Sequence, residues 1–432
     1  MDFTKDTRLR QLALKSQDEQ KGDSIDQLLD VNDLVYMMPK NLSLASARNV
    51  KEYVAQKSNY SSSESSVIIT IQSGAQYVNW AASHLRFSLD ITRASNAPNT
   101  SWGKGSAFNL FREVIVTSRS GQEICRLDRC NVYRLHKDRL HMSDEELTSV
   151  GSLMGYDRVV AANGAAPPTT EWIIPMCKVA GCFDSKKLMP NWLSSGLRIE
   201  LRLETPATAF VNLTTAVPPA ASTVAVTSYT IKDPKIACDT FHLNDAAMKK
   251  LNEISARNGL EYVFQAQHAV SDNFTTEQTT VDVNKAVSRA LGCTAITRQI
   301  NNISTIGEDS LVCEAFDIKQ SQFRLGSQYF PHQPLESLAE HYWNTLYTTE
   351  KLKSSHPSSV SLAEYESDYG VITTNLERSN ILALSGLPIN NSMTLSLDAR
   401  YANAPGGGRQ LTLFLEHVVV AKIFVNNCSI TE

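Results

Sequence analysis

The chain has 432 residues, of which 42% are hydrophobic and 20% charged, a composition typical of a folded soluble protein. This length exceeds what one compact core accommodates, so we expect two or three domains. The net charge of −4 and the isoelectric point of about 6.2 argue against a general nucleic-acid-binding protein, because such a protein needs a basic face.

Residues 1–35 mix many charges with apolar residues at roughly helical spacing. The apolar positions are Leu9, Leu12, Leu14, Ile25, Leu28, Leu29 and Val31. We expect an N-terminal arm of one or two short helices, which is either a tail that docks on a neighbouring subunit or a mobile terminus. The start of the chain lacks the apolar region of a secretory signal, so we expect a protein made and folded in a reducing compartment.

Short strand patterns follow from residue 67 onward. Residues 85–91 alternate strictly between apolar and polar, which turns one face of a strand toward a core. Residues 111–117 and 123–127 flank Gly121 and predict a hairpin. The other strand candidates of the first half are 67–71, 172–177, 197–203, 228–231 and 235–241.

Helices and loops interrupt these strands. A helix is expected at 143–155, because Ser143 and Asp144 provide a plausible N-terminal cap. Residues 156–171 and 205–227 are low in charge and rich in Ala, Pro and Thr, so we expect two long loops there.

After a helical run at 244–259, the second half again consists of short strand patterns with an inserted helix. A helix is expected at 335–352, with apolar and aromatic residues on one side. Strand candidates are 262–268, 294–298, 310–316, 382–384, 393–396, 410–415 and 418–425.

A weak internal repeat connects the halves. Arg126 and Leu127 recur as Arg324 and Leu325, an offset of 198 residues, and the pattern at 197–203 is echoed at 393–398. Each half contains about seven to eight strand candidates and one inserted helix. This order predicts an all-β protein with a few inserted helices, built as two consecutive eight-stranded jelly-roll β-sandwiches.

We therefore expect four segments: an N-terminal arm (1–35), a first jelly roll (36–243), a connecting helix (244–259) and a second jelly roll (260–432).

Catalytic motifs of known types were not found, and we expect no catalytic, cofactor-binding or metal-binding residues. Residues 406–409 (Gly-Gly-Gly-Arg) could cradle a phosphate, but they lack the Lys-Ser/Thr that follows in a P-loop, so a turn is favoured. His136 and His141 lie in a basic stretch that we expect to be solvated rather than metal-binding. Asp144, Glu145 and Glu146 fit a helix start better than a glycosidase site.

The cysteines and tryptophans also have two interpretations each. Most of the eight cysteines lie in strand-like apolar segments, so buried reduced thiols are favoured over metal ligands and disulfides. The cysteines are at 125, 130, 177, 182, 238, 293, 313 and 428. Core or interface packing is favoured over sugar stacking for the tryptophans at 80, 102, 172, 192 and 343.

A family resemblance rests on the order of several segments rather than on one motif. These segments are 77–80 leading into 85–91, 108–116 with the turn 121–124, the asparagine-tyrosine stretch 131–133, and 323–331 before a helix. In this order the chain resembles the double jelly-roll major capsid proteins of the adenovirus, tectivirus and virophage lineage, most closely those of polinton-like viruses and virophages. The resemblance covers roughly residues 36–432.

The resemblance implies a structural subunit of an icosahedral double-stranded DNA virus shell, without catalysis or cofactor. It implies a homotrimer that forms a pseudo-hexameric capsomer, with neighbouring capsomers, penton proteins and minor capsid proteins as partners and no sequence-specific nucleic-acid binding. The arm would contact the inner capsid face. The implied location is the virion, assembled inside the host cell without secretion. The alternative is a two-domain jelly-roll carbohydrate-binding protein or glycan hydrolase, and a spike or penton protein is a third option.

Overall fold

The computed structural model describes most of the chain from residue 45 onward. The described ranges are 45–93, 99–161, 170–185, 187–213, 226–300, 309–313, 317–352, 354, 356–378, 385–390, 393–404, 407–424 and 427–431. The expected arm at 1–35 and the strand expected at 382–384 lie outside these ranges. The chain divides into two compact units, 1–46 and 47–432, and the first described strand spans the boundary between them. Within the described ranges, no helix is both long and apolar enough to cross a lipid bilayer.

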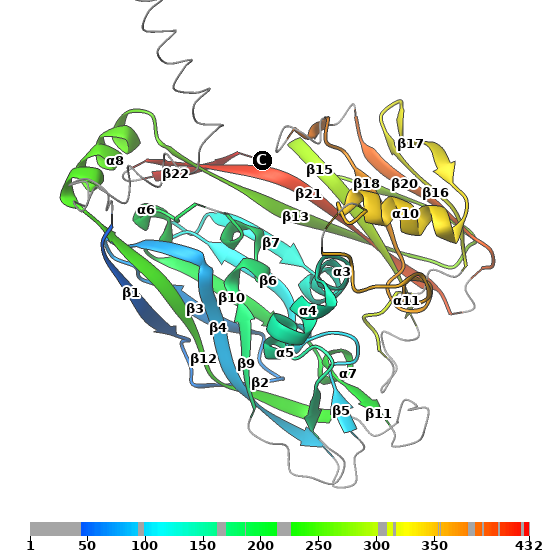
Figure 1. The fold of residues 1–432 in the computed structure, drawn as a ribbon, viewed down its shortest axis with the longest axis horizontal. Coiled ribbons are helices and arrows are strands. Elements are labelled where there is room, and N and C mark those ends of the chain that lie inside the picture. The colour runs from blue at the N-terminus through cyan, green and yellow to red at the C-terminus, as the bar shows by residue number, and fades with distance from the viewer. Residues whose placement is uncertain are drawn as a thin grey trace, which may run out of the picture. The chain divides into compact units, whose positions relative to one another are not determined.

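The first half of the chain forms two principal antiparallel sheets (Figure 1). The first sheet has the order β1 (Ala45–Val54), β12 (Val226–Leu243), β4 (Tyr77–Arg93), β9 (Thr170–Pro175), with β2 (Asn59–Ser61) beside β12. The second sheet has the order β3 (Ser66–Ile71), β10 (Leu197–Leu203), β6 (Phe111–Thr117), β7 (Glu123–Asp128). The expected hairpin is confirmed, because β6 pairs antiparallel with β7.

The second half forms two further sheets from its own strands. One has the order β13 (Leu260–Phe274), β21 (Arg409–Phe424), β15 (Val287–Gln299), β18 (Val371–Asn375), with β19 (Leu387–Ile389) beside β15 and β22 (Asn427–Thr431) beside β21. The other has the order β14 (Gln278–Val283), β20 (Leu395–Tyr401), β16 (Ile318–Leu325), β17 (Gln328–Leu335).

Both halves arrange their eight principal strands in the same way. When these strands are numbered one to eight along each half, one sheet has the order 1-8-3-6 and the other has the order 2-7-4-5. Eight antiparallel strands in two sheets with these crossovers form a jelly roll. The predicted fold class, two consecutive jelly rolls with inserted helices, is therefore confirmed.

The structure corrects one part of the internal repeat. Arg126 and Leu127 lie on β7, the fifth strand of the first half, whereas Arg324 and Leu325 lie on β16, the fourth strand of the second half. These pairs are not equivalent, and their match in letters is a coincidence of two similar amphipathic strands. The similar patterns at 197–203 and 393–398 do lie at equivalent positions, because β10 and β20 are the seventh strands of their halves.

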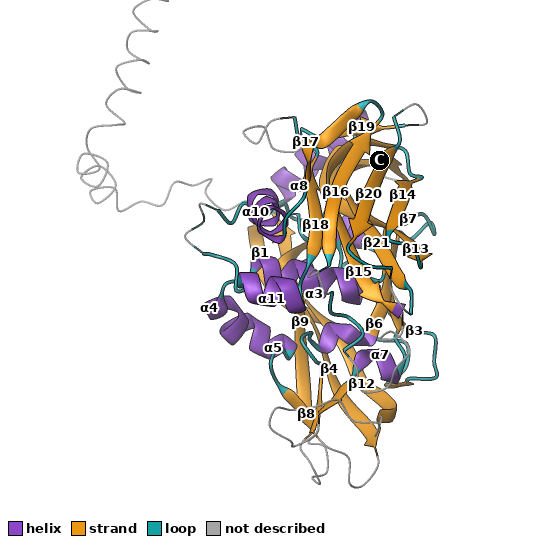
Figure 2. Cartoon of the chain, turned by 90° about the vertical axis from the view of Figure 1, so that its right-hand side faces the viewer, coloured by secondary structure: helices purple, strands orange, loops and turns teal. Residues whose placement is uncertain are grey.

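Helices follow the fifth strand of each half. In the first half these are α3 (Cys130–His141), α4 (Asp144–Glu146), a π-helical turn (Leu147–Gly151) and α5 (Ser152–Met154). In the second half they are α10 (Leu338–Thr348) and α11 (Leu362–Ser367), while α8 (Asp245–Arg257) stands between the halves. Both views place α3, α5, α10 and α11 on the same side of the sheets (Figure 2).

Two helices begin at a serine whose side chain caps the helix, as the sequence indicates. The Ser143 hydroxyl accepts a hydrogen bond from the amide of Glu146, whose carboxylate accepts from the amide of Ser143, which confirms the expected helix start. The helix expected at 335–352 is shorter, because β17 continues to Leu335 and Ser337 caps α10.

Several expected strands differ in extent. The candidates 228–231 and 235–241 form the single strand β12, and 410–415 and 418–425 form β21. The described part of 310–316 forms no strand and makes only an isolated bridge from Cys313 to Tyr369. Leu311 and Cys313 are fully buried there, so their apolar character serves packing of a connecting segment rather than a sheet.

The two expected long loops contain more structure than their composition suggested. In their described parts they form β8 (Val159–Ala161) and β11 (Val211–Leu213), which pair with β5 (Asn99–Ser101) in a third, small sheet. The remaining short elements are 3-10 helices at Ala107–Leu110, Met176–Lys178 and Gly181–Phe183, α6 (Asn191–Ser194) and α7 (Pro206–Ala209).

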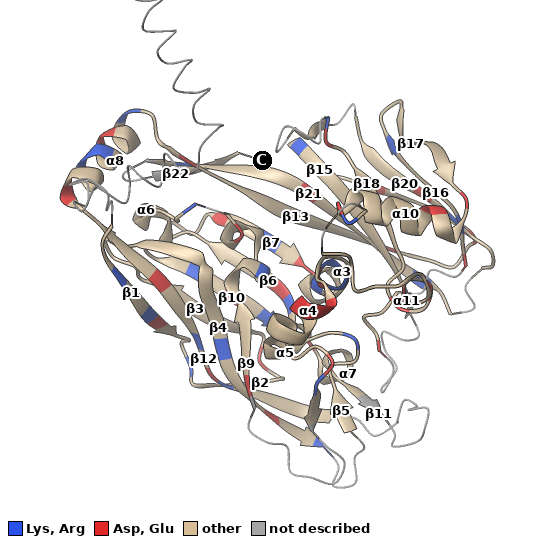
Figure 3. Ribbon diagram, in the orientation of Figure 1, with Lys and Arg blue, Asp and Glu red and all other residues tan. Residues whose placement is uncertain are grey.

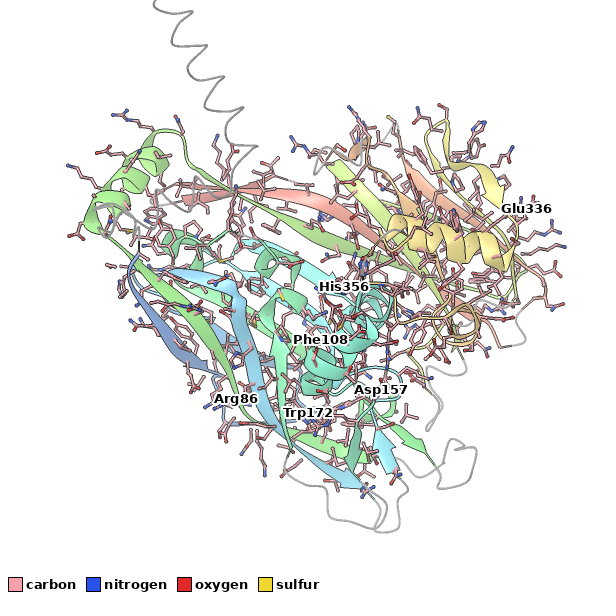
Figure 4. The ribbon with its side chains drawn as sticks, viewed as in Figure 1. Arg86, Phe108, Asp157, Trp172, Glu336 and His356 are labelled. Carbon is pink, nitrogen blue, oxygen red and sulfur yellow. The ribbon has the colours of Figure 1, made fainter. Side chains whose placement is uncertain are left out.

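The core of each jelly roll consists of the inward side chains of alternating strands. In β3, Val67, Ile69 and Ile71 are buried while the residues between them are more exposed. Large aromatic side chains fill the space between the sheets, and Phe108 and Trp172 lie among the first-half ribbons (Figure 4). Basic and acidic residues are interspersed along the strands and along α8 (Figure 3).

Candidate functional site

The helix α3 contacts residues of both jelly rolls. Ten of its twelve residues are buried, including His136, Asp138 and Arg139. The stretch 134–141 was expected to be solvated because it is basic, and this expectation is wrong. Three of its charged side chains have charged partners, so burial does not leave these three without compensation. Lys137 pairs with Glu416 of the second half, and Asp138 and Arg139 pair with Lys178 and Asp157 of the first.

A three-residue polar cluster fixes α3 to β21. The Tyr133 hydroxyl donates to Glu416 Oε1 at 2.6 Å, and Lys137 Nζ lies 2.6 Å from the same oxygen. The Tyr133 ring also lies 5.2 Å from the ring of Phe414, between centroids. Burial would raise the pKa of Glu416, but the charge and hydrogen bond of Lys137, with the bond from Tyr133, lower this pKa to about 2. The carboxylate is thus held in its charged form.

The two histidines of α3 are neutral packing residues. His136 Nε2 lies 3.1 Å from the carbonyl oxygen of Leu311 in the second half, and its ring packs edge-on against Tyr369. Burial lowers the pKa of both His136 and His141 to about 3, and the nearby charge of Lys137 adds to the effect for His141. No group of three or more potential His, Cys, Asp or Glu ligands occurs in the described ranges.

A second set of contacts lies toward the C-terminal end of α3. Arg139 pairs with Asp157 at 2.8 Å, and its carbonyl oxygen accepts from the Ser359 hydroxyl at 3.0 Å. The Lys104 amide donates to Asp309 at 2.7 Å, and the Lys104 ammonium lies 3.2 Å from Asp368. The contacts of Ser359, Asp309 and Asp368 connect the second half to the first.

A close backbone approach completes the junction. A Cβ atom at Gly181 would lie 1.7 Å from the carbonyl oxygen of Gln265 in β13, so only glycine fits. Beside it, the Tyr262 hydroxyl donates to the carbonyl oxygen of Cys182 at 2.8 Å. The two jelly rolls are therefore in direct contact over β13, α3 and β21.

The tryptophans divide between core and surface. Trp80, Trp102 and Trp172 are buried, and Trp102 packs against Trp172 with ring centroids 5.5 Å apart. These three rings are packing residues and are not accessible to a sugar. Trp192 packs against the core from a partly buried position. Trp343 on α10 is different, with 63% of its surface exposed.

Trp343 belongs to an open groove between α10 and β17. The groove has a volume of ≈ 630 Å³, and its lining includes Pro331, Pro334, Leu335 and Trp343. Tyr347, also on α10, is 51% exposed. Exposed aromatic residues of this size are enriched at protein–protein interfaces.

The remaining expectations concern thiols and the glycine-rich segment. Seven of the eight cysteines, all except Cys428, form no disulfide, and six of these seven are buried. The described part of 406–409 is a turn before β21, and Arg409 points to Asp317, with which it forms a buried ion pair. A phosphate role for Arg409 is therefore not supported.

Comparison with known proteins reveals similarity in structure alone. No protein-family model matches the sequence, and no curated protein sequence is significantly similar to it. Among solved structures, VP54 of PBCV-1, fitted into a reconstruction of the virophage Sputnik, matches with a TM-score of 0.61 and 9% identity, over 92% of this chain and 99% of that chain.

Two further matches agree. A structure from the Sputnik virophage has a TM-score of 0.61 and 9% identity over 91% of this chain and 90% of that one. The Faustovirus major capsid protein has a TM-score of 0.60 and 9% identity over 94% of this chain and 96% of that one. The chain has the double jelly-roll fold. At this level of identity the similarity concerns the fold, and function requires a separate argument.

Sequence reasoning missed the residues that hold the junction. Glu416 and Lys137 come from opposite halves, and Gly181 is one of 19 glycines, so none is distinctive by itself. A signal for α3 was present, since Tyr133, His136 and Leu140 recur at helical spacing.

Proposed function

We propose that the protein is a major capsid protein whose homotrimers form the pseudo-hexameric capsomers of an icosahedral double-stranded DNA virus shell. The observation that carries this proposal is the duplication of one strand order, 1-8-3-6 and 2-7-4-5, within a single chain. Three chains around a threefold axis supply six jelly rolls, and these six can occupy a position of approximate sixfold symmetry in a shell. The similarity to capsid structures over nearly the whole chain supports this function.

The polar side chains described above support a structural role without catalysis or cofactor. The pKa of Glu416 is low because it pairs with Lys137, and the pKa of His136 is low because it is buried. Both shifts are explained by the contact between the jelly rolls, without a role in chemistry. The carbohydrate alternative loses support because three tryptophans are inside the core.

The partners follow from this role. They are further copies of the chain within the trimer and in adjacent capsomers, together with penton and minor capsid proteins. We retain the segments 1–35, 36–243, 244–259 and 260–432 as a proposed division, with the arm as a contact on the inner capsid face. The proposed location is the virion, assembled inside the host cell without secretion, and sequence-specific binding to nucleic acid is not part of the role.

Light scattering coupled to size-exclusion chromatography tests this proposal directly. The capsid function requires a particle of three times 47.8 kDa, and electron microscopy of concentrated protein would show hexagonal tiles or shells. A stable monomer that binds defined glycans on an array would refute the capsid function and support the alternative. A trimer without glycan binding would refute the alternative.

A further inference from the structure

A small polar pocket lies at the junction of the jelly rolls, where α3 begins. It has a volume of ≈ 240 Å³, and residues of both halves line it. Three of these are arginines: Arg112 on β6, Arg129 just before α3, and Arg298 on β15. The contact between Tyr133, Lys137 and Glu416 does not involve this pocket.

Two of the arginines share one neutral acceptor. Arg129 Nη1 donates to Gln410 Oε1, and Arg298 Nη2 donates to the same oxygen at 2.7 Å. Arg298 is only 4% exposed, and its other terminal nitrogen donates to the carbonyl oxygen of Ser310 at 3.1 Å. An amide oxygen carries no net charge, so neither guanidinium is neutralised by this contact.

Each of these guanidinium groups also keeps an unused donor. The Nε atoms of Arg129 and Arg298 are buried and have no hydrogen-bond partner among the described residues. A buried charged donor without a partner is costly, because it has lost water and gained no bond in return. The arrangement is therefore incomplete as it stands.

The nearby carboxylates of the described residues form no ion pair with Arg129 or Arg298. Glu204, the acidic residue of the pocket lining, accepts from Asn131 Nδ2 at 3.2 Å and from the Thr205 amide at 2.9 Å. Asp128 accepts from the Arg129 amide at 2.9 Å and lies 3.9 Å from Arg112 Nε. Three arginines against one glutamate leave the lining with an excess of positive charge.

The start of α3 adds to the positive potential. Its first turn contains no acidic residue, and the N-cap position, Arg129, provides no capping hydrogen bond. The amino end of a helix favours an anion through its free amides and its dipole. Burial lowers the pKa of Arg298 to about 10, and the charge of Arg129 adds to this effect.

We propose that this pocket binds a tetrahedral oxyanion, a phosphate or sulfate group, held between the two jelly rolls. Arg298 and Arg129 would hold it with their guanidinium groups, and Arg112 would close the outer side. Guanidinium groups match such oxyanions in shape and charge. The volume corresponds to about eight waters at liquid density, which accommodates one oxyanion with residual water. The anion would connect β6 and α3 of one half to β15 of the other.

Thermal unfolding of the full chain under controlled anion conditions tests the proposal. Inorganic phosphate is titrated at constant ionic strength, with sodium chloride as the balance, so that general screening stays fixed. We expect the melting temperature to rise by several degrees and to saturate, because a ligand that binds only the folded state stabilises it by mass action. Sulfate should act similarly. ADP serves to compare a phosphate ester with the free ion, and a larger shift with ADP would identify the ester as the preferred source.

Two variants and a control assign the effect to the pocket. Arg112→Gln removes an exposed arginine of the lining, and we expect at least a tenfold weaker phosphate response with normal folding. Arg298→Met removes the buried charge and should abolish the response. Arg198→Gln is the matched control, because Arg198 is an exposed arginine on a strand adjacent to β6 and lies 3.2 Å from a carboxylate.

Several results would overturn the proposal. One is a wild-type melting temperature that does not respond to phosphate or sulfate. Another is an Arg112→Gln variant with the same response as Arg198→Gln. Acetate that is as effective as phosphate would show that tetrahedral shape is not recognised. These measurements concern the protomer, so their outcome is independent of whether the chain forms trimers.

Discussion

The contact between Glu416 and Lys137 predicts a stability cost that depends on pH. Glu416→Gln preserves the size of the side chain and its oxygen for the Tyr133 hydroxyl, but it removes the charge that Lys137 faces at 2.6 Å. The carboxylate side chain is 16% exposed and the ammonium side chain 31% exposed, so water screens the pair only in part.

The magnitude follows from the pKa of Glu416. A decrease from 4.5 to about 2 corresponds to an upper limit of about 3.4 kcal/mol at pH 7, at roughly 1.36 kcal/mol per pKa unit. Partial exposure of Lys137 reduces this, and we expect a loss of about 2 kcal/mol in the free energy of unfolding. A carboxylate with a lowered folded-state pKa contributes its full stability above its unfolded pKa. This contribution disappears as pH falls from 4.5 toward 2, so the loss should be less than about 1 kcal/mol at pH 3.

Urea denaturation at equal protomer concentration, followed by tryptophan fluorescence, measures both values. The matched control is Glu171→Gln, which removes an exposed carboxylate 3.3 Å from Arg86 and should cost less than about 0.5 kcal/mol. An equal loss for Glu416→Gln at pH 7 and pH 3 would refute the electrostatic reasoning, since it would assign the cost to packing. A loss no larger than that of the control would show that the pair contributes nothing.

Four further predictions concern the junction, the thiols and assembly. Gly181→Ala should lower the melting temperature by several degrees, because the added Cβ would meet a backbone oxygen. The control is Gly151→Ala, which should be neutral or stabilising, because this glycine is in a helical turn and its nearest contact would be at 3.4 Å. Equal effects of the two variants would contradict the close approach at Gly181. A reducing agent should leave the melting temperature unchanged, because seven of the eight cysteines form no disulfide, and a large decrease would reveal a disulfide. Trp343→Ala should weaken the trimer without unfolding the protomer, as judged by light scattering and circular dichroism, and an unchanged dissociation constant would remove this side chain from the interface. Deletion of residues 1–35 should leave trimers intact and weaken shell assembly in electron microscopy; loss of the trimer would contradict this role.

The fold was predictable because its evidence is local. Alternation at 85–91, the turn at Gly121 and the cap at Ser143 each specify one element by short-range chemistry, and the structure contains all three. The order of such elements was sufficient to predict two jelly rolls. The sequence predicted two short strands where the structure has one long strand, in β12 and again in β21. Both strands contain polar residues in their middle, and such residues resemble the end of a strand when only a few neighbouring positions are considered.

The junction was not predictable, because its chemistry depends on pairs far apart in sequence. Lys137 and Glu416 are 279 residues apart, and Gly181 meets a carbonyl oxygen of Gln265. A basic stretch such as 134–141 is normally solvated, and only its partners explain its burial. The same holds for Arg129 and Arg298, whose proximity no spacing rule predicts.

The equivalence of the halves has a consequence for the two helices that follow their fifth strands. The helix of the first half, α3, packs on β21 of the second, with Tyr133 and Phe414 in contact. The helix of the second half, α10, has no such neighbour among the described residues and leaves Trp343 largely exposed. In a closed ring where the halves alternate, the strand equivalent to β21 in the next copy is β12. In the proposed trimer, the contact of α3 with β21 within one subunit would therefore recur between α10 of one subunit and β12 of the next.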